Sequence, residues 1–195
     1  MIKNTGLILM IILLFMCHNT YAQKEYQIVS EKSELTIDGT STLHDWQMIA
    51  NDFVCAASID FDALKNKQVK DVHFQCDAEK ILSDKNAMDK KAHKALKVDE
   101  FPKVEFAFQS VKSFEQKEDQ FAGEIMGFLT LAGEKKEIML PFVGKILSES
   151  QFDISGTVPL KMSDFGISPP IFMFGAVKTG DDVNLKFQFT FKTIE

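Results

Sequence analysis

The sequence predicts an all-β fold in which about eight antiparallel strands surround a core, with a single helix between two of them. Residues 151–161 and 183–191 carry the strongest signal, because apolar and polar side chains alternate in both almost without a break. Alternation with a period of two is typical of a half-buried antiparallel strand. Only residues 83–97 place apolar side chains at the spacing of a helix. The dominance of the two-residue period therefore sets the fold class.

Six further segments show the same alternation in weaker form: residues 26–37, 43–59, 72–76, 104–108, 121–131 and 138–146. In the second of these the apolar side chains change parity between Met48 and Phe53, which predicts a bulge or a sharp bend. Such strands either close as an up-and-down barrel or fold as a two-layer sandwich, and closure removes the exposed strand edges. The interior of an eight-stranded barrel is filled by side chains or holds one small ligand.

The predicted helix begins with Ser83 and Asp84 as capping residues and ends before the Phe101-Pro102 pair. Its polar surface is rich in lysine, at positions 90, 91, 94 and 97. The simplest interpretation is a solvated helix face. The alternative is a surface that attracts an anionic head group or touches a membrane transiently, although neighbouring acidic residues reduce the local positive charge.

The first residues have the layout of a secretory signal peptide. Lys3 precedes an apolar run at residues 6–16, which is too short to cross a bilayer. Thr20 and Ala22 are small enough to occupy the −3 and −1 positions of a cleavage site. The predicted signal peptide therefore spans residues 1–22.

Cleavage after Ala22 leaves residues 23–195 as one domain, in which no second domain boundary is visible. We expect the mature protein to be periplasmic or secreted. Cys17 offers a lipoprotein anchor as the alternative, but Met16 stands where that cleavage needs a small residue. The exported, unanchored form is therefore favoured.

Export to an oxidising compartment gives the two remaining cysteines two interpretations. Cys55 shares the parity of Phe53, and Cys76 shares that of Phe74, so both face inward and their strands place them within reach if they are neighbours. A disulfide between them would close a loop of about 20 residues and stabilise the fold by roughly 3 kcal/mol. The other interpretation is two small buried thiols.

The composition limits the class of partner. The chain has a formal net charge of −6, and all 22 of its basic residues are lysines. Without arginine it lacks the planar fork that binds phosphates, and a negative chain is repelled by nucleic acid, so we expect no nucleic-acid partner. Its 18 phenylalanines supply apolar surface without a polar group, which suits a thick core or an apolar ligand.

The sequence carries no complete motif for catalysis or cofactor binding. It has no nucleophile elbow, no glycine-rich phosphate loop and no histidine pair at metal-binding spacing, so we expect no catalytic residue, no metal site and no cofactor. One alternative is that His44 and Asp45 act as an acid and base pair. Neighbouring strand residues point to opposite faces, however, which favours a structural role for this segment with Trp46 as its anchor.

Residues 162–175 form a long connection between two clean strands and contain four large apolar side chains in succession at residues 171–174. A run of this kind is seldom exposed unless it covers a core or borders a cavity. The connection is therefore a candidate for one edge of a binding site.

Four short segments occur in a fixed order along the chain: STLHDW (residues 41–46), FPKVEF (101–106), GFLTLAG (127–133) and SDFGI (163–167). With the helix and the signal peptide, they make the sequence resemble the YceI-like family of exported lipid-binding proteins. The resemblance implies an eight-stranded antiparallel, lipocalin-like up-and-down barrel with a helix beside or over its mouth. It implies a polyisoprenoid or similar long-chain lipid inside the barrel, and no catalysis.

Phenylalanine suits the lining of such a cavity, because it is apolar, unbranched at Cβ and needs no hydrogen-bond partner. We expect the ligand-binding side chains to be Trp46, Phe74, Phe106, Phe108, Phe142, Phe165, Phe172 and Phe187. The family often has an arginine just before the SDFGI segment. Lys161 and Ser163 stand in that neighbourhood here, which favours a neutral or quinone-like head group. Two alternatives remain, a lipid-modifying enzyme that uses His44 and Asp45 and a structural barrel filled solid by its own side chains.

Overall fold

The computed structural model describes residues 24–59, 69 and 71–194. The predicted signal peptide, its cleavage site and Cys17 lie outside these residues. The strands are β1 (Lys24–Ile28), β2 (Glu34–Ser41), β3 (Trp46–Ala50), β4 (Phe53–Ile59), β5 (Asp71–Asp77), β6 (Ile81–Leu82), β7 (Lys103–Lys117), β8 (Gln120–Leu131), β9 (Glu134–Ser148), β10 (Gln151–Lys161), β11 (Ile171–Phe172) and β12 (Val177–Thr193). Within the described residues the α-helical segment is α3 (Asn86–Leu96), and short 3-10 turns are η1 (Ser30–Lys32), η2 (Ala78–Lys80), η3 (Met162–Phe165) and η4 (Met173–Gly175).

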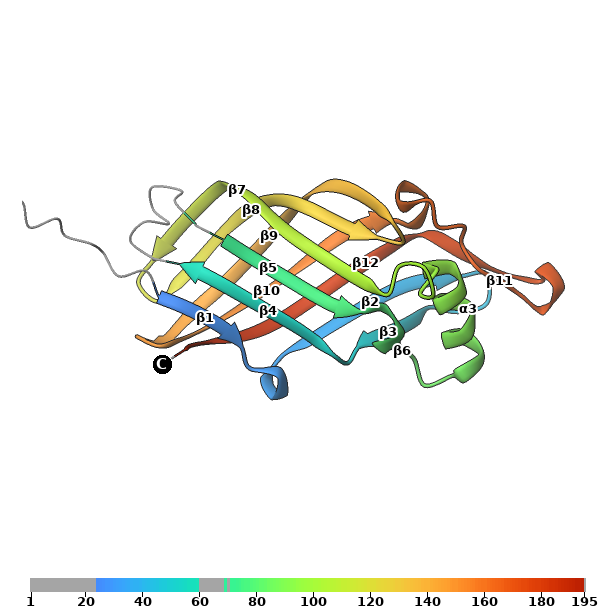
Figure 1. Ribbon diagram of the computed structural model, residues 1–195, viewed down its shortest axis with the longest axis horizontal. Coiled ribbons are helices and arrows are strands. Elements are labelled where there is room, and N and C mark those ends of the chain that lie inside the picture. Colours follow the sequence, from blue (N-terminus) through green and yellow to red (C-terminus); the bar gives the residue numbers. More distant parts are fainter. Residues whose placement is uncertain (1–23, 60–68, 70, 195) are drawn as a thin grey trace, which may run out of the picture.

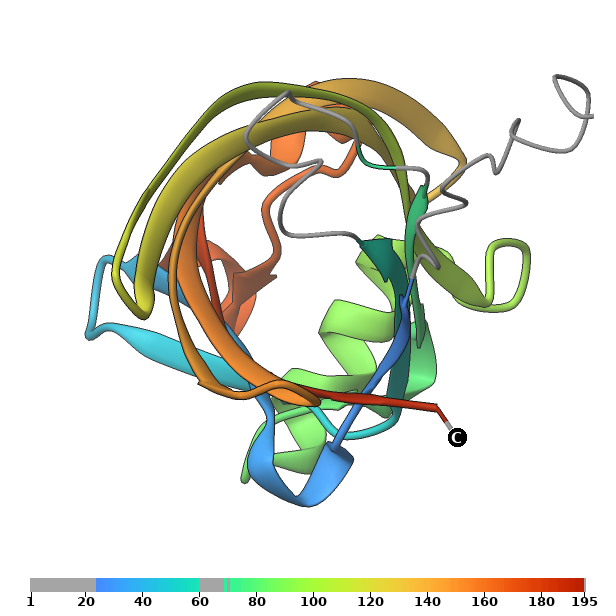
Figure 2. The same ribbon diagram turned by 90° about the vertical axis from the view of Figure 1, so that its left-hand side faces the viewer.

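Eight strands form a closed antiparallel barrel in the order β1-β4-β5-β7-β8-β9-β10-β12, and β1 pairs with β12 to close the ring. Closure is set by three pairs, from Tyr26 opposite Thr193 to Ile28 opposite Phe191. Figure 2 looks along the barrel from the end opposite α3 and shows the ring of strands, with the helix at its far end. The predicted up-and-down barrel is confirmed, and the sandwich alternative is wrong.

Two of the predicted strands are each divided in the structure. The expected bend between Met48 and Phe53 is confirmed, and it separates β3 from β4. Residues 26–37 were expected to form one strand, but η1 interrupts them and divides them into β1 and β2. The Ser33 hydroxyl holds this break, since it donates to the Val29 carbonyl (2.8 Å) and accepts from the Thr190 N–H (3.0 Å).

Strand β12 is the longest strand and joins the two ends of the barrel. One of its edges pairs with β10 over the whole of that strand. Its other edge pairs first with β2 and then, near the C-terminus, with β1. The β2–β3–β6 extension therefore enlarges the wall only at the end of the barrel where α3 lies (Figure 1).

The seam between β9 and β10 is only partly hydrogen-bonded. Pairing runs from Gln151 opposite Ser148 to Ser155 opposite Val143, and it stops two positions from Pro141, which has no N–H to donate. Beyond this point η3 lies against β9, β10 and β12, and its Phe165 side chain is fully buried. The turn therefore packs beside the part of the barrel where these two strands are not paired.

Aromatic side chains fill the end of the barrel opposite α3. The Phe152 ring stacks on Phe191 at 4.9 Å between centroids and meets Tyr26 edge-on at 5.0 Å. Phe121 lies 6.1 Å from Phe152 and 6.2 Å from Phe142. These rings form the aromatic plug (Tyr26, Phe121, Phe142, Phe152 and Phe191), and such pairs add about 0.5–1.5 kcal/mol each beyond their buried area.

Candidate functional site

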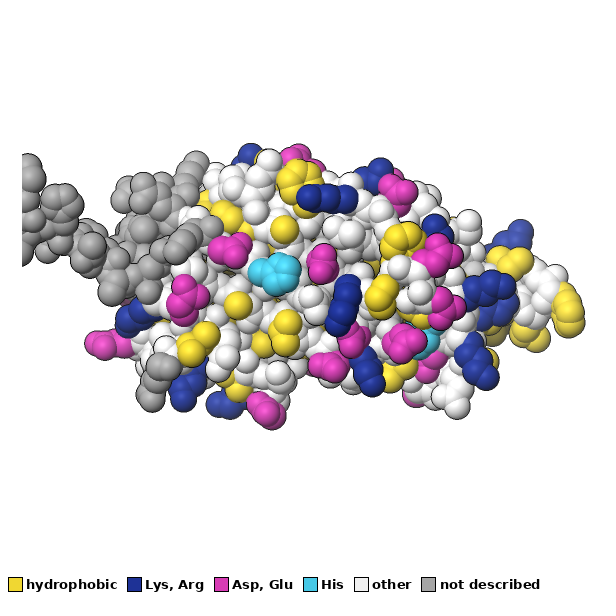
Figure 3. Space-filling model, viewed as in Figure 1, with side chains coloured by type: hydrophobic (Ala, Val, Ile, Leu, Met, Phe, Trp, Pro, Cys, Tyr) yellow, Lys and Arg dark blue, Asp and Glu magenta, His cyan; other side chains and the backbone are white. Residues whose placement is uncertain are grey.

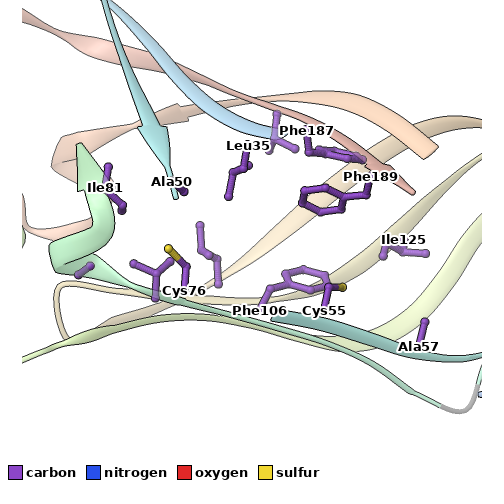
Figure 4. Packing of buried hydrophobic residues seen from close by; sticks show 14 of the residues in the cluster. Leu35, Ala50, Cys55, Ala57, Cys76, Ile81, Phe106, Ile125, Phe187 and Phe189 are labelled. Carbon is purple, nitrogen blue, oxygen red and sulfur yellow. The ribbon is translucent and has the colours of Figure 1, made fainter. Parts of the chain in front are cut away.

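The half of the barrel nearest α3 encloses a cavity of about 1170 Å³. Its walls are inward-facing side chains of the barrel strands together with β2, β3, β6 and α3. In Figure 4 Leu35 and Phe187 reach inward from one wall, and Phe106 and Cys55 from the wall that faces it. The volume exceeds the range of about 300–1,000 Å³ usual for drug-sized ligands. A cavity of this size argues against the barrel filled solid by its own side chains.

Five of the eight side chains predicted to bind a ligand line this cavity: Trp46, Phe74, Phe106, Phe172 and Phe187. They come from β3, β5, β7, β11 and β12, so strands far apart in the sequence contribute to one surface. The other three, Phe108, Phe142 and Phe165, are not part of its lining.

Each of these three residues packs elsewhere for a local reason. Phe108 precedes a register shift between β7 and β8 and packs, half-buried, against the core. Phe142 belongs to the aromatic plug and lines a second, smaller crevice of about 500 Å³. Phe165 is fully buried in η3, which lies against β9, β10 and β12. Strand parity could not separate Phe108 and Phe142 from the cavity lining, because it gives the face of a residue and not its height in the barrel.

Aliphatic side chains make up much of the lining that sequence reasoning missed. They share the inward parity of the predicted phenylalanines and include Leu35, Ile37, Met48, Ile125, Leu129, Ile138, Leu140, Ile154, Leu160 and Leu185. The alternating pattern places most of these aliphatic side chains on the inward face, but the predicted ligand-binding set included only aromatic residues.

Helix α3 covers the cavity at the mouth of the barrel through Met88, Ala92, Ala95 and Leu96. Two contacts tie it to the short strand β6 and the segment that follows. The buried Asp89 carboxylate accepts hydrogen bonds from the backbone N–H and the hydroxyl of Ser83, both at 2.7 Å. The His93 ring lies 3.0 Å from the Ile81 carbonyl through Nε2.

The predicted caps of this helix are wrong. The helix starts at Asn86 with Lys85 as its N-cap residue, and Ser83 accepts from the Lys85 N–H (3.0 Å) and binds Asp89. Because Ser83 binds Asp89, its hydroxyl does not accept from a backbone N–H of the first helical turn, and the helix has no side-chain cap. The predicted end is confirmed, because Lys97 adopts the left-handed conformation (φ 54°) and stops the helix.

Polar residues reach the cavity only around its mouth. They are Ser41, His44, Asp45, Gln47, Asn51, Ser83, Asp84, Lys85 and Thr179. The deeper lining is apolar apart from the thiols Cys55 and Cys76. The site therefore suits a molecule with a long apolar part and a small polar end at the mouth.

Trp46 and His44 occupy this mouth in different ways. The Trp46 indole N–H donates to the Thr40 carbonyl (2.9 Å), and its ring covers Gly39, where a Cβ atom would collide with it. The His44 Nδ1 atom lies 2.7 Å from the backbone carbonyl of Asp45. The neighbouring carboxylate therefore does not orient the imidazole, which is what acid–base catalysis by the pair would need.

Lys161 and Ser163, which stand near the arginine position of the family, are engaged outside the cavity. Lys161 pairs with Asp182 at 2.6 Å, and this carboxylate raises the pKa of the lysine. Ser163 donates its hydroxyl and its backbone N–H to Asp181, which lowers the pKa of that carboxyl group. Neither residue lines the cavity.

Cys55 and Cys76 are free, buried thiols on the inward face. Cys55 lies opposite Phe74 and Cys76 opposite Phe53, so the two cysteines are diagonal neighbours on β4 and β5. Diagonal positions are about 7–8 Å apart, at or beyond the span that a disulfide bridges without backbone movement. Burial raises the pKa of each thiol to about 12.

Neither a metal-binding cluster nor a membrane-spanning helix is present in the part of the chain that the structure describes. It contains no cluster of three or more histidine, cysteine, aspartate or glutamate side chains that could hold a metal ion. None of its helices has the length and apolar character needed to span a membrane.

The fold and the cavity define an eight-stranded barrel with an internal apolar site and a helical cover. The sequence matches the model of the YceI-like domain over residues 26–191, and the chain therefore belongs to the YceI-like family. Among curated proteins, none matches the sequence.

Solved structures with the same fold come from three bacteria. BcnA of Burkholderia cenocepacia has a TM-score of 0.67 at 13% identity, over 84% of this chain and 98% of its own. A polyisoprenoid-binding domain from Saccharophagus degradans, implicated in plant cell wall breakdown, has a TM-score of 0.67 at 10% identity, over 87% and 98%. A YceI protein of Campylobacter jejuni has a TM-score of 0.51 at 20% identity, over 74% and 82%.

Proposed function

We propose that this protein binds one long-chain apolar lipid, of the polyisoprenoid type, in the cavity beneath α3 and does not transform it. The observation that carries the proposal is the distribution of the lining, which is apolar in depth and polar only at the mouth. A lipid tail needs an apolar tunnel without unpaired polar groups, and its polar end needs water or hydrogen-bond partners. Both requirements are met in one cavity.

Burial of the tail supplies the binding free energy in this proposal. Each CH₂-sized unit removed from water contributes about 0.8 kcal/mol, so ten units contribute about 8 kcal/mol. Binding costs about 4–15 kcal/mol in lost translational and rotational freedom, so ten units exceed the low end of this cost but not the high end. A long chain is therefore bound much better than a short one. The description of the Saccharophagus degradans relative as polyisoprenoid-binding agrees with a ligand of this class.

The mouth favours a neutral or quinone-like head group over a phosphate. Its charged lining residues are the carboxyl groups of Asp45 and Asp84 and the amine of Lys85. The chain has no arginine, and Lys161 and Ser163 are bound to surface carboxylates. Among the residues that line the cavity itself, a phosphate would meet more negative than positive charge.

The proposed cellular role is that of an exported carrier or storage protein, in the periplasm or outside the cell. This part rests on the signal-peptide pattern of residues 1–22. A non-enzymatic role agrees with the absence of catalytic motifs in the sequence and with the contact of His44 to a backbone carbonyl.

Mass spectrometry of an organic extract of the purified protein tests the proposal. We expect a long-chain lipid in a reproducible amount, near one molecule per chain. Absence of co-purified lipid, together with no uptake of added polyprenyl alcohol or isoprenoid quinone, would contradict it.

A pair of variants on neighbouring residues of β8 locates the site. Leu129 lines the cavity, whereas Phe128 does not, because successive strand residues face opposite sides. Leu129→Trp should reduce the lipid content by narrowing the cavity, and Phe128→Trp should leave it unchanged. Circular dichroism and elution volume show whether each variant is folded. Equal lipid contents in two folded variants would exclude this cavity as the site.

A further inference from the structure

Two loops at the mouth of the barrel expose large apolar side chains to solvent. Phe174 is completely exposed (112%), Met173 is 71% exposed, and Leu43 of the neighbouring loop is 66% exposed. With Ile171, also exposed, these residues form the apolar tip. In Figure 1 the turn beside β11 projects beyond the rest of the molecule along its long axis.

The two loops are held together as one unit. The Thr42 N–H donates to the Lys178 carbonyl (3.0 Å), and the Lys178 N–H donates to the Thr42 hydroxyl (3.2 Å). Ile171 also pairs with Lys178 across β11 and β12. Leu43 and the β11–η4 turn therefore move together rather than as independent flaps.

The backbone of the turn adopts a conformation that favours exposure. Met173 (φ 50°), Phe174 (φ 55°) and Gly175 (φ 97°) are left-handed in succession. Bulky residues rarely occupy this region, and such residues cluster where function requires them. Here the strained turn presents Phe174 fully to solvent, and Met173 lies at the rim of the cavity with most of its surface exposed.

Lysine side chains border the apolar tip. The Lys91 amine donates to the Ile171 carbonyl (2.9 Å) and lies 5.4 Å from the centre of the Phe172 ring. Lys94 is one helical turn further along α3, and Lys178 is opposite Ile171. Among the described residues, none of these three lysines forms an ion pair. Figure 3 shows dark-blue and yellow side chains side by side at this end.

We propose that the apolar tip docks the mouth of the barrel on an anionic lipid bilayer, with Phe174, Met173 and Leu43 inserted among the lipids and the three lysines against the head groups. Aromatic and aliphatic side chains beside lysines are the composition of segments that lie in the membrane interface. The tip is convex and presents only a few side chains, whereas a stable protein partner would bury about 800 Å² on each side. The bilayer is therefore the occupant that fits.

Docking there would place the cavity mouth at the membrane surface, because Leu43, Phe172 and Met173 also line the cavity. This consequence rests on the proposed function, but docking itself does not. Since the whole chain carries a net charge of −6, attraction arises only within about 8–10 Å of the lysines, and the protein must bind with this end forward.

Co-sedimentation with vesicles tests the proposal. Phosphatidylcholine vesicles that contain phosphatidylglycerol should pellet the mature protein, and each lysine near such a surface strengthens binding by about fivefold. Phosphatidylcholine vesicles should bind less of it, and added salt should weaken binding to the anionic vesicles. The double variant Met173→Ser/Phe174→Ser should bind at least about tenfold more weakly.

The matched control is Val143→Ser/Leu147→Ser, which removes two exposed apolar side chains of β9, and it should bind like the unmodified protein. No pelleting of the unmodified protein with anionic vesicles would overturn the proposal, as would equal binding of the tip variant. A dimer in the absence of vesicles that the tip variant abolishes would overturn it in favour of self-association.

The lipid content separates this proposal from the proposed function. Vesicle binding without any lipid in the cavity supports docking and contradicts the carrier role. Uptake of dispersed polyprenyl alcohol without vesicle binding supports the carrier role and overturns docking.

Discussion

At the scale of single residues, the two buried cysteines show how burial determines reactivity. The thiolate is the reactive form of cysteine, and burial raises the pKa of Cys55 and Cys76 from 9.0 to about 12. Both thiols also face the cavity, where a bound lipid would lie against them. They should be unreactive at neutral pH although they are not bonded to each other.

We predict that iodoacetamide modifies the folded protein far more slowly than the urea-unfolded protein at the same pH. A thiol count on the unfolded mature chain without reductant should give two thiols. A count of zero would show a disulfide and contradict the structure at this point.

The same pKa values set the direction of an alkaline pH dependence. Between pH 9 and pH 12 the folded state keeps protons on these thiols that the unfolded state has lost, so the free energy of unfolding falls as the pH rises. The slope is at most about 1.4 kcal/mol per pH unit for each thiol. Urea unfolding of the Cys55→Ala/Cys76→Ala variant should show a shallower decline. Parallel profiles would contradict this account.

At the scale of elements, helix α3 is the cover of the cavity, and Asp89 is the side chain that holds it. This carboxylate is buried and accepts two hydrogen bonds from Ser83. Its removal takes away the acceptor of two half-buried donors of Ser83, and hydrogen bonds to a charged group contribute about 1.5–3 kcal/mol each. These two bonds tie the helix to the segment that precedes it.

We predict that Asp89→Ala accelerates hydrogen exchange of the α3 amides while the barrel strands exchange at their original rates. Asp89→Asn keeps one acceptor oxygen, so its α3 amides should exchange at a rate between those of the unmodified protein and Asp89→Ala. Unchanged exchange in α3 would show that apolar packing alone holds the cover. Uniformly faster exchange would indicate loss of the whole fold instead.

Elements also show which parts of the structure the sequence can predict. Strand alternation correctly placed Phe187 and Phe106 inward, because that pattern depends only on local burial. It could not predict the position of Phe165, because this residue lies in the turn η3, where no strand alternation applies. The caps of α3 were predicted wrongly, because Ser83 binds Asp89 instead of capping the helix.

At the scale of the whole molecule, the barrel holds the aromatic plug at one end and the cavity towards the other. Helix α3 and the turn beside β11 lie at the cavity end (Figure 1). The plug fills one end of the barrel with aromatic rings, and the cavity lies beyond it, partly lined by further phenylalanines. Alternation could not divide the barrel in this way, because Phe152 and Ile154 share a parity and only the second lines the cavity. The position of each residue along the barrel axis depends on the register of every strand in the ring.

The most direct test of lipid binding uses the single tryptophan of the chain, Trp46, which lines the cavity mouth. Its fluorescence should be quenched during titration with a long-chain isoprenoid quinone and should reach a plateau near one quinone per chain. A short-chain quinone with the same head group should quench only at much higher concentration, because it buries fewer apolar units. Equal quenching by both quinones without a plateau would mean collision in solvent, and would contradict a lipid-binding cavity.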